Sequence, residues 1–215
     1  ASGVGVSGDR IVIGAGRATY LGFVGFAAIF EREAGQWTYS ADLIGSDSVP
    51  GDQFGSRFSM SGDRLAVGAY LANGGAGAVY VFRNHRGEWV EEAKISSTDP
   101  ALRGFGNVIS LDGDYLAVGP ANIFRRNGRR WLEQANLTSP QGVYSFGGSL
   151  FITGRQLFVG ARVSENDFWV LYFYERFGQA WMLSQRLMAA DSSPSSGYGG
   201  ILGRSLRYLV AGGAL

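Results

Sequence analysis

The chain of 215 residues has no cysteine, a single histidine and five prolines, and its formal net charge is +1. The missing thiols exclude a disulfide framework and thiolate metal sites. A charge balance this close to zero supplies no field that would attract nucleic acid or an anionic membrane. No run of about 18 apolar residues occurs, so we expect no segment that spans a bilayer. Nothing in the composition calls for a cofactor, and we expect none.

Glycine and aromatic residues are abundant instead. The sequence has 34 glycines and 13% aromatic residues, which favours many strands joined by tight turns. An imperfect repeat with a period of roughly 50 residues runs through the chain, and a period of that length is typical of a propeller or an array. The predicted repeats, all in a single domain of residues 1–215, are 1–53, 54–104, 105–145, 146–197 and a partial 198–215.

Each copy combines four signals. An aromatic-Gly pair opens the copy, a Gly-Asp turn leads into an apolar run that ends in Gly-Ala, and an aromatic-rich run is followed by a tryptophan. The second copy shows the full pattern as FGSRFSMSGDRLAVGAYLANGGAGAVYVFRNHRGEW. We interpret the tryptophans as structural residues that pack within their own blades; they are Trp37, Trp89, Trp131 and Trp181.

Four candidate strands occur in each full copy, at 57–61, 64–69, 78–82 and 89–95 in the second. The second and third are apolar on both faces, as strands between stacked sheets must be, and the fourth alternates like an outer strand. The fold class is therefore all-β, a propeller of four-stranded antiparallel blades, with a β-sandwich as the alternative. Four blades and a partial fifth would leave an apolar edge, so we expect further repeats or a partner subunit to complete a larger ring.

The joint recurrence of these motifs resembles the FG-GAP repeat of integrin α-subunit-type β-propellers, in the variant without calcium loops. The resemblance implies a propeller in an extracellular or cell-surface recognition, adhesion or scaffolding setting. Calcium-binding members place several acids between the first two strands, because a hard cation needs convergent oxygen ligands. That connection here is as short as Ser61-Gly62-Asp63, so no metal site is expected.

Signals for catalysis are weak. The pattern Gly3-x-Gly5-x-x-Gly8 matches a dinucleotide fingerprint, but a strand follows it where a helix is needed, so it indicates a hairpin. The histidine, His85, lies in a polar turn, and a general base would need a partner that the motif does not show. Acids such as Asp47 and Asp99 recur before the aromatic-Gly pairs, which favours turn caps over paired acid/base catalysis.

Two further groups of residues stand out. The arginines that flank Asn127-Gly128 indicate a solvated turn, with an anion-binding patch as the alternative; they are Arg125, Arg126, Arg129 and Arg130. Asn136 opens the one N-x-[ST] sequon, so it is a candidate glycosylation site.

Loop length varies on one rim alone. In a four-stranded blade, the second-to-third and blade-to-blade connections share a rim, and these connections carry the length variation along the chain. Variable loops on a rigid scaffold are where binding specificity is usually placed. The candidate ligand-binding residues of this rim are Tyr20, Phe23, Tyr70, Asn73, Tyr144, Glu165, Asn166 and Asp167.

The sequence thus favours a non-catalytic propeller that binds a protein or glycan through the variable-loop rim. The alternative is a propeller hydrolase, or the accessory domain of a secreted enzyme, with carboxylates or a metal at the axial channel. The side chains of the first strand of each copy discriminate between the two, because an apolar axis without an acid cluster leaves the enzyme without a site.

Overall fold

A computed structural model describes residues 3–16, 22–140, 143–163, 168–188, 201–204 and 209–212. Within these ranges, the strands form four sheets of four antiparallel strands and one two-stranded sheet. Blade 1 consists of β1 (Gly3–Ser7), β2 (Arg10–Gly14), β3 (Ala27–Glu33) and β4 (Gln36–Leu43). Blade 2 consists of β5 (Arg57–Ser61), β6 (Arg64–Ala69), β7 (Ala78–His85) and β8 (Glu88–Ile95).

The later blades repeat this order. Blade 3 consists of β9 (Ile109–Asp112), β10 (Tyr115–Val118), β11 (Asn122–Asn127) and β12 (Arg130–Asn136). Blade 4 consists of β13 (Val143–Thr153), β14 (Gln156–Val163), β15 (Phe168–Phe177) and β16 (Ala180–Leu187). A hairpin of β17 (Ile201–Arg204) and β18 (Leu209–Gly212) follows. One short helical turn, α1 (Ala72–Gly75), interrupts the β6–β7 connection.

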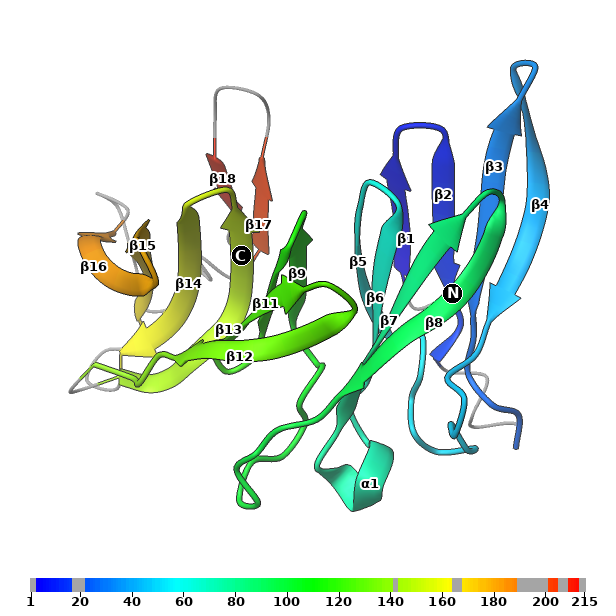
Figure 1. Ribbon diagram of the computed structural model, residues 1–215. Helices are drawn as coiled ribbons and strands as arrows, with labels where there is room; N and C mark the ends of the chain where they lie inside the picture. Colours follow the sequence, from blue (N-terminus) through cyan, green and yellow to red (C-terminus); the bar gives the residue numbers. More distant parts are fainter. Residues whose placement is uncertain are drawn as a thin grey trace.

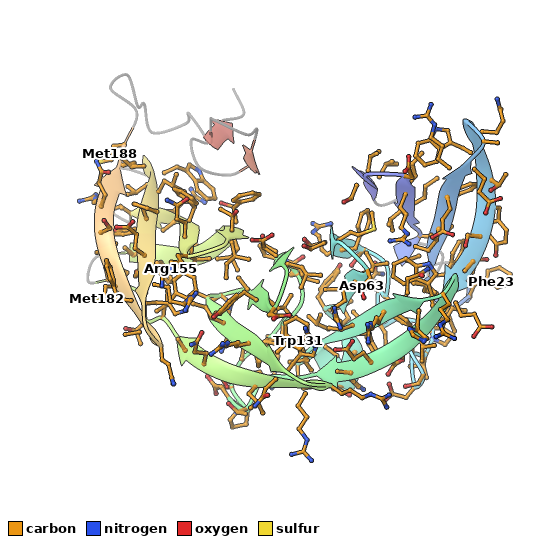
Figure 2. The ribbon with its side chains drawn as sticks, turned by 45° about the horizontal axis from the view of Figure 1, so that its top comes forward. Phe23, Asp63, Trp131, Arg155, Met182 and Met188 are labelled. Atoms are coloured by element: carbon orange, nitrogen blue, oxygen red, sulfur yellow. The ribbon has the colours of Figure 1, made fainter. Side chains whose placement is uncertain are left out.

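The four blades form an open arc (Figures 1 and 2). The first strands of successive blades adjoin, β1 with β5, β5 with β9 and β9 with β13, so they line the inside of the arc. The middle strands are the most buried; every residue of β6 is buried, as an apolar run between two sheets requires. The prediction of a β-propeller with four-stranded antiparallel blades is confirmed for these four repeats.

The recurring Gly-Ala and aromatic-Gly motifs meet at the seams between blades. A Cβ atom built on Gly14 would lie 2.1 Å from the carbonyl oxygen of Gly55 in the next blade. A Cβ on Gly68 would lie 2.1 Å from the carbonyl oxygen of Gly106, one seam further on. Real Cβ atoms do not approach an oxygen so closely, so these positions require glycine. The two motifs recur together because they form the two sides of one backbone-to-backbone contact.

The aromatic residue of the pair fills the core beside that contact. Phe54 and Phe105 are fully buried. Phe54 packs edge-on against Tyr80 with ring centroids 5.3 Å apart, and Phe105 packs against Phe124 at 5.9 Å. The buried cluster around Phe54 includes Val12 of blade 1, so the core is continuous from one blade to the next. Large aromatic side chains in such edge-on pairs contribute more than their buried area alone.

Candidate functional site

The two rims of the arc differ as the strand order predicts. The β1–β2, β3–β4, β5–β6 and β7–β8 turns of blades 1 and 2 lie at one end of the sheets, and α1 lies at the other (Figure 1). We call these ends the hairpin rim and the loop rim. The hairpin rim has short turns, whereas the loop rim carries the β2–β3 and β6–β7 connections and the segments between blades. The loops of the loop rim differ more in length from blade to blade than the turns of the hairpin rim, and loops of this kind usually carry binding specificity.

Three of the predicted loop-rim side chains lie in the described residues. Phe23 is exposed and lies at the outer edge of the arc (Figure 2). Tyr70 is half-buried where β6 ends, and Asn73 is exposed in α1 with a positive φ of 54°. The backbone of Tyr144 belongs to β13, but its side chain is outside the described part. The other candidates lie outside the described residues; they are Tyr20, Glu165, Asn166 and Asp167.

The loop rim exposes apolar side chains that sequence reasoning missed. Ile44, Val49 and Leu71 join Phe23 as large apolar residues with 44–66% of their surface exposed. Ile44 and Val49 lie in the segment between blades 1 and 2, and Leu71 directly precedes α1. The sequence offered a signal for these residues, because each is apolar at a turn or loop position, but the predicted rim set consisted of aromatic and polar residues alone.

Hydrogen bonds order the segment between blades 1 and 2 and join it to the β6–β7 connection. The Val49 amide donates to Asp52 Oδ2 at 3.0 Å, and the Leu71 amide donates to the Asp52 carbonyl oxygen at 3.2 Å. The Gly104 amide, in the next blade-to-blade segment, donates to the Gly75 carbonyl oxygen at 2.9 Å. Backbone pairing of this kind holds the exposed apolar residues in place before any partner arrives, which reduces the entropic cost of binding.

The inner face of the arc is lined by the first strands. Val4 and Val6 of β1 are exposed there, and Phe58 and Met60 of β5 are half-buried. A groove about 580 Å³ in volume runs along the ends of the four first strands and includes the side chain of Asp112. One oxygen of that carboxylate accepts the Gly154 amide at 2.6 Å, which ties β9 to the next blade.

Serine hydroxyls make the same kind of inter-blade bond. Ser59 Oγ accepts the amide of Leu111 at 2.9 Å, and Ser110 Oγ accepts the amide of Ile152 at 3.0 Å. Ser59 and Ser110 occupy equivalent places in their blades, because Ser59 lies two residues before Ser61 at the end of β5 and Ser110 lies two residues before Asp112 at the end of β9. Gly5 holds the equivalent place in β1 and has no side-chain oxygen that could accept such a bond.

Neither a metal centre nor an acid pair is found in the described residues. No group of three or more His, Cys, Asp or Glu side chains there is placed to hold a metal ion. Along the inner groove, Asp112 is the one carboxylate of the described lining. His85 is exposed at the end of β7. In the ranges that the structure covers, no helix has the length and apolar character to cross a bilayer.

Two of the repeated tryptophans correct one expectation, because Trp89 and Trp181 contact the neighbouring blade, whereas Trp37 contacts Arg32 of its own blade. Trp89 lies under the guanidinium of Arg10, which belongs to blade 1, with 5.4 Å between the guanidinium carbon and the ring centroid. Trp181 packs edge-on against Tyr115 of blade 3 at 6.3 Å. Packing within the own blade was expected from the fixed repeat position. A tryptophan at a fixed position in the repeat can equally well pack between blades, because every blade faces its neighbour with the same strands.

The recurring acids before the aromatic-Gly pairs also differ from one another. Asp99 is a turn cap, because its Oδ1 accepts the Ala101 amide at 2.8 Å. Asp47 instead accepts the Tyr80 hydroxyl at 2.8 Å and Lys94 Nζ at 2.6 Å, both from blade 2. The hydrogen bond from Lys94, followed by that from Tyr80, lowers the pKa of the Asp47 carboxyl. Asp47 therefore links the segment between blades to blade 2.

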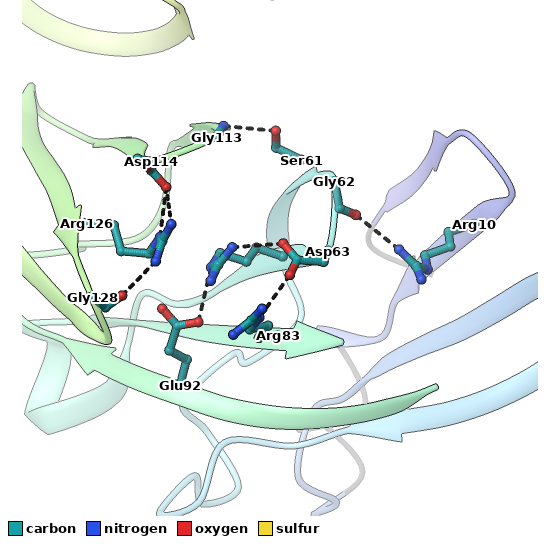
Figure 3. A network of polar contacts seen from close by, with 11 residues as sticks. Arg10, Ser61, Gly62, Asp63, Arg83, Glu92, Gly113, Asp114, Arg126 and Gly128 are labelled. Atoms are coloured by element: carbon teal, nitrogen blue, oxygen red, sulfur yellow. Dashed lines mark hydrogen bonds and ion pairs between the residues drawn. The ribbon is translucent and has the colours of Figure 1, made fainter. Parts of the chain in front are cut away.

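A network of polar contacts lies at the hairpin rim, where Arg10 Nη1 of blade 1 donates to the Gly62 carbonyl oxygen of blade 2 at 3.1 Å (Figure 3). The ion pairs of this network lie within single blades. Asp63 accepts Arg64 Nη1 at 2.8 Å and Arg83 Nε at 2.9 Å. Burial alone would raise the pKa of Asp63, but the hydrogen bond from Arg83 and the charges of both arginines lower it. Arg126 contacts Asp114 and donates to the Gly128 carbonyl oxygen at 2.7 Å, so it is occupied within blade 3. Of the four arginines for which an anion-binding patch was the alternative interpretation, Arg126 is therefore a structural residue.

Two equivalent grooves lie between the outer strands at the hairpin rim, and sequence reasoning did not find them. The first, between blades 2 and 3, has a volume of about 280 Å³ and is lined by Arg83, His85, Val90, Glu91, Glu92 and Arg129. The second, between blades 3 and 4, is lined by Arg125, Arg126, Asn127, Leu132, Glu133, Gln134 and Gln179. We call these grooves the 2–3 groove and the 3–4 groove. The two grooves are equivalent because β7 and β8 pair in the same register as β11 and β12, so corresponding residues of blades 2 and 3 line them.

Comparisons with known proteins agree with the repeat and the fold. The sequence profile of the FG-GAP repeat matches residues 37–82. No curated protein matches the chain. The fold is similar to that of the Aleuria aurantia lectin, solved as a single-site mutant with Fucα1-6GlcNAc, with a TM-score of 0.50 and 14% identity over 86% of this chain and 59% of that one. The same lectin with α-methyl-L-fucoside gives a TM-score of 0.46 and 14% identity, over 88% and 60%. The chain thus spans less than two thirds of that lectin's length.

Proposed function

The chain carries an FG-GAP repeat on a propeller scaffold, and from this premise we propose that it is a non-catalytic recognition module of the cell surface or extracellular space. Its partner is a protein or a glycan, bound at the loop rim. The observation that carries this proposal is the set of four exposed apolar side chains on that rim, Phe23, Ile44, Val49 and Leu71. The segments of Val49 and Leu71 are joined by the hydrogen bond from the Leu71 amide to the Asp52 carbonyl oxygen. Exposed apolar groups that gather on rigid loops typically mark an interaction site.

Two further observations support the proposal. The inner groove has Asp112 as its one carboxylate in the described part, and the Gly154 amide already occupies one of its oxygens, so the described lining gives the hydrolase alternative no acid pair to rest on. The Aleuria aurantia lectin, which has a similar fold, was solved with a fucosylated disaccharide bound. We therefore include a glycan among the partners, with the fucosylated disaccharide as the first probe.

The test compares a loop-rim variant with a matched control. Phe23, Val49 and Leu71 are changed to serine together, and the control changes Met182 and Leu183, equally exposed apolar residues of β16, to serine. The three proteins are applied to an array of glycans that includes Fucα1-6GlcNAc and to an array of purified extracellular proteins.

We expect the unmodified chain to bind on at least one array, the control to bind equally well, and the loop-rim variant to lose about tenfold or more in affinity. Three buried apolar contacts are sufficient for such a loss, since each contributes about 1 kcal/mol or more when fully covered. Binding that is equal in all three proteins would place the interface elsewhere. An unmodified chain that binds on neither array would contradict the proposal.

A further inference from the structure

A row of three side chains recurs at the hairpin rim of every blade, and blade 4 changes its chemistry. The row begins in the turn between the first two strands, crosses to the third strand and ends at the repeated tryptophan. In blade 3 the row is Asp114, Arg126 and Trp131. The turn residue is Asp9, Asp63 or Asp114 in blades 1 to 3, but it is Arg155 in blade 4 (Figure 2).

The backbone of blade 4 keeps the geometry of blade 3 at this row. The Arg126 amide donates to the Asp114 carbonyl oxygen at 2.8 Å, and the Arg176 amide donates to the Arg155 carbonyl oxygen at the same distance, 2.8 Å. Residues that face each other across two strands have Cβ atoms about 5 Å apart. Arg155 and Arg176 are therefore direct neighbours, and blade 4 has two positive charges where blade 3 has an ion pair.

The acid of blade 3 satisfies its arginine, because Asp114 Oδ1 accepts Arg126 Nε at 2.8 Å (Figure 3). In blade 4, Arg176 Nη1 donates to the Gly178 carbonyl oxygen at 2.8 Å, but Arg176 Nε is buried without a hydrogen-bond partner. Arg176 Nη2 has no described partner either, and unlike Nε it keeps contact with solvent. Arg155 is exposed, and its side chain forms no hydrogen bond or ion pair with a described residue.

A third guanidinium lies beside this pair. The guanidinium carbon of Arg176 lies 4.7 Å from the ring centroid of Tyr115, at the start of β10 in blade 3. The guanidinium carbon of Arg125 lies 5.8 Å from the same centroid, and Arg125 also lines the 3–4 groove. Tyr115 thus holds arginines of blades 3 and 4 beside one ring. The side chain of Arg125 forms no hydrogen bond or ion pair with a described residue.

The carboxylates around this seam have other partners. Glu175 precedes Arg176 in β15, so its side chain lies on the other face of the sheet, where it accepts the Ser184 hydroxyl at 2.9 Å. Both oxygens of Glu133 accept side-chain groups from outside this cluster. Asp112 accepts a backbone amide of blade 4 at 2.6 Å and forms no ion pair with a described residue. One carboxylate charge beside three arginines leaves the cluster with a net positive charge.

We propose that Arg155 and Arg176, with Arg125 beside them, bind a tetrahedral oxyanion, which is a sulfate or a phosphate group. The anion takes the place that the carboxylate of Asp114 has in blade 3. Its oxygens accept from the exposed guanidinium of Arg155 and from Arg176 Nη2. A dianion with several oxygens bridges two guanidinium groups better than a carboxylate does, because each group keeps an oxygen of its own.

This site lies on the hairpin rim, whereas the proposed partner of the protein binds at the loop rim. The two proposals therefore fail independently. The serine variants at the loop rim leave the three arginines untouched, and the variants described next leave the loop rim untouched.

The central variant is Arg155→Asp, which restores the acid of the other three blades. Calorimetric titration of the full chain with sodium sulfate measures the affinity, and thermal unfolding measures the Tm. We expect the unmodified chain to bind sulfate with a dissociation constant of about 1 mM, a value ordinary for so small a ligand. At about 20 mM, sulfate should then raise the Tm by about 4–7 °C relative to sodium chloride of equal ionic strength.

Arg155→Asp should give no titration signal, and sulfate should raise its Tm hardly more than chloride, because only the weak general effect of sulfate remains. Without sulfate, this variant should melt at or above the Tm of the unmodified chain, because an ion pair replaces two facing like charges. A loss of binding is thereby separated from a loss of folding.

The matched control is Arg129→Asp, which makes the same change of charge on the same rim. Arg129 lines the 2–3 groove, on the other side of blade 3, so this variant should bind sulfate within about twofold of the unmodified chain. Arg125→Gln should weaken sulfate binding by about three- to tenfold, because it removes one neighbouring charge. Acetate should bind the unmodified chain at least about tenfold more weakly than sulfate.

Glucose 6-sulfate distinguishes the two sources of the group. An affinity equal to that of inorganic sulfate supports a site for a group carried by a larger ligand, and binding of the inorganic ion alone supports a site for the free ion. Sulfate that binds Arg155→Asp as tightly as the unmodified chain would place the anion elsewhere and overturn the proposal. An equal loss in Arg129→Asp would reduce the effect to overall charge, and acetate that binds as tightly as sulfate would contradict the tetrahedral anion.

Discussion

The contact between Gly68 and Gly106 gives the sharpest test of how the blades are joined. In Gly68→Ala, the new Cβ would lie 2.1 Å from the Gly106 carbonyl oxygen and 3.0 Å from Cδ1 of Ile109. Ordinary contact begins at 3.4 Å, so blades 2 and 3 must separate by more than about 1 Å at this point. Both sides of the contact are backbone, and neither can turn away as a side chain would.

The magnitude follows from these distances. Overpacking a close contact costs about 1–3 kcal/mol, and a backbone-to-backbone clash belongs at the upper end of that range. Replacing glycine inside a strand returns about 0.5–1 kcal/mol, so the net loss is about 2 kcal/mol. For a domain of this size, 1 kcal/mol corresponds to about 2–4 °C in Tm. We expect Gly68→Ala to lower the Tm by about 4–8 °C.

The assay is thermal unfolding followed by circular dichroism and calorimetry. Gly148→Ala is the matched control, because its Cβ would meet the Trp169 ring at an ordinary 3.6 Å. That variant should keep its Tm or gain slightly. If Gly68→Ala melted within about 2 °C of the unmodified chain, the seam would have room to spare, and our explanation of the paired motifs would be wrong.

Three other predictions concern the seams and the surface. Trp181→Ala, at 8% exposure, should cost about 3–5 kcal/mol, whereas Trp37→Ala, at 41%, should cost clearly less; equal losses of Tm would contradict the seam assignment. Because the folded pKa of Asp47 is lowered, its contribution to stability should be complete above its unfolded pKa of about 3.9 and should disappear as the pH falls through the lower folded value, so Asp47→Asn should flatten the acid limb of a Tm-against-pH curve. The pKa of Lys94 is raised although burial opposes this, so Lys94 should contribute to stability until the pH rises through its folded pKa. Asn136 is exposed at the end of β12, so expression in a secretory host should add a glycan mass that an endoglycosidase removes, and an unmodified mass there would contradict the expectation.

Much of the fold could be predicted because the repeat specifies it several times over. The limits of β6 were predicted to the residue, since an apolar run between a Gly-Asp turn and a glycine is unambiguous. The third strand was predicted to end at Phe82, but β7 continues to His85. Its last residues are polar, so apolar periodicity carried no signal there, although Asn84 is buried. The cross-strand pairing of His85 with Glu88 shows where the strand ends.

The candidate sites were harder to predict, because they depend on contacts between blades. Asp47 looked like a local turn cap, and its partners Tyr80 and Lys94 lie on two other strands far along the chain. The same holds for Trp181, whose indole N–H donates to Gln134 Oε1 of the preceding blade at 3.4 Å. A sequence repeat fixes what each blade has in common, while a binding site depends on where one copy departs from the next.

The serine hydroxyls on the inside of the arc have a consequence for association between molecules. A first strand has a free edge, and the amide groups of such an edge are a template for pairing with a foreign strand. Ser59 and Ser110 occupy the outward amides of Leu111 and Ile152, so β9 and β13 are closed to that template by their neighbours' side chains. Many proteins protect edges with charge or proline, and this chain uses the preceding repeat instead. A serine of one blade thereby covers an edge amide of the next blade and reduces edge-to-edge pairing there. β5 receives no such serine bond from β1, because Gly5 has no hydroxyl group.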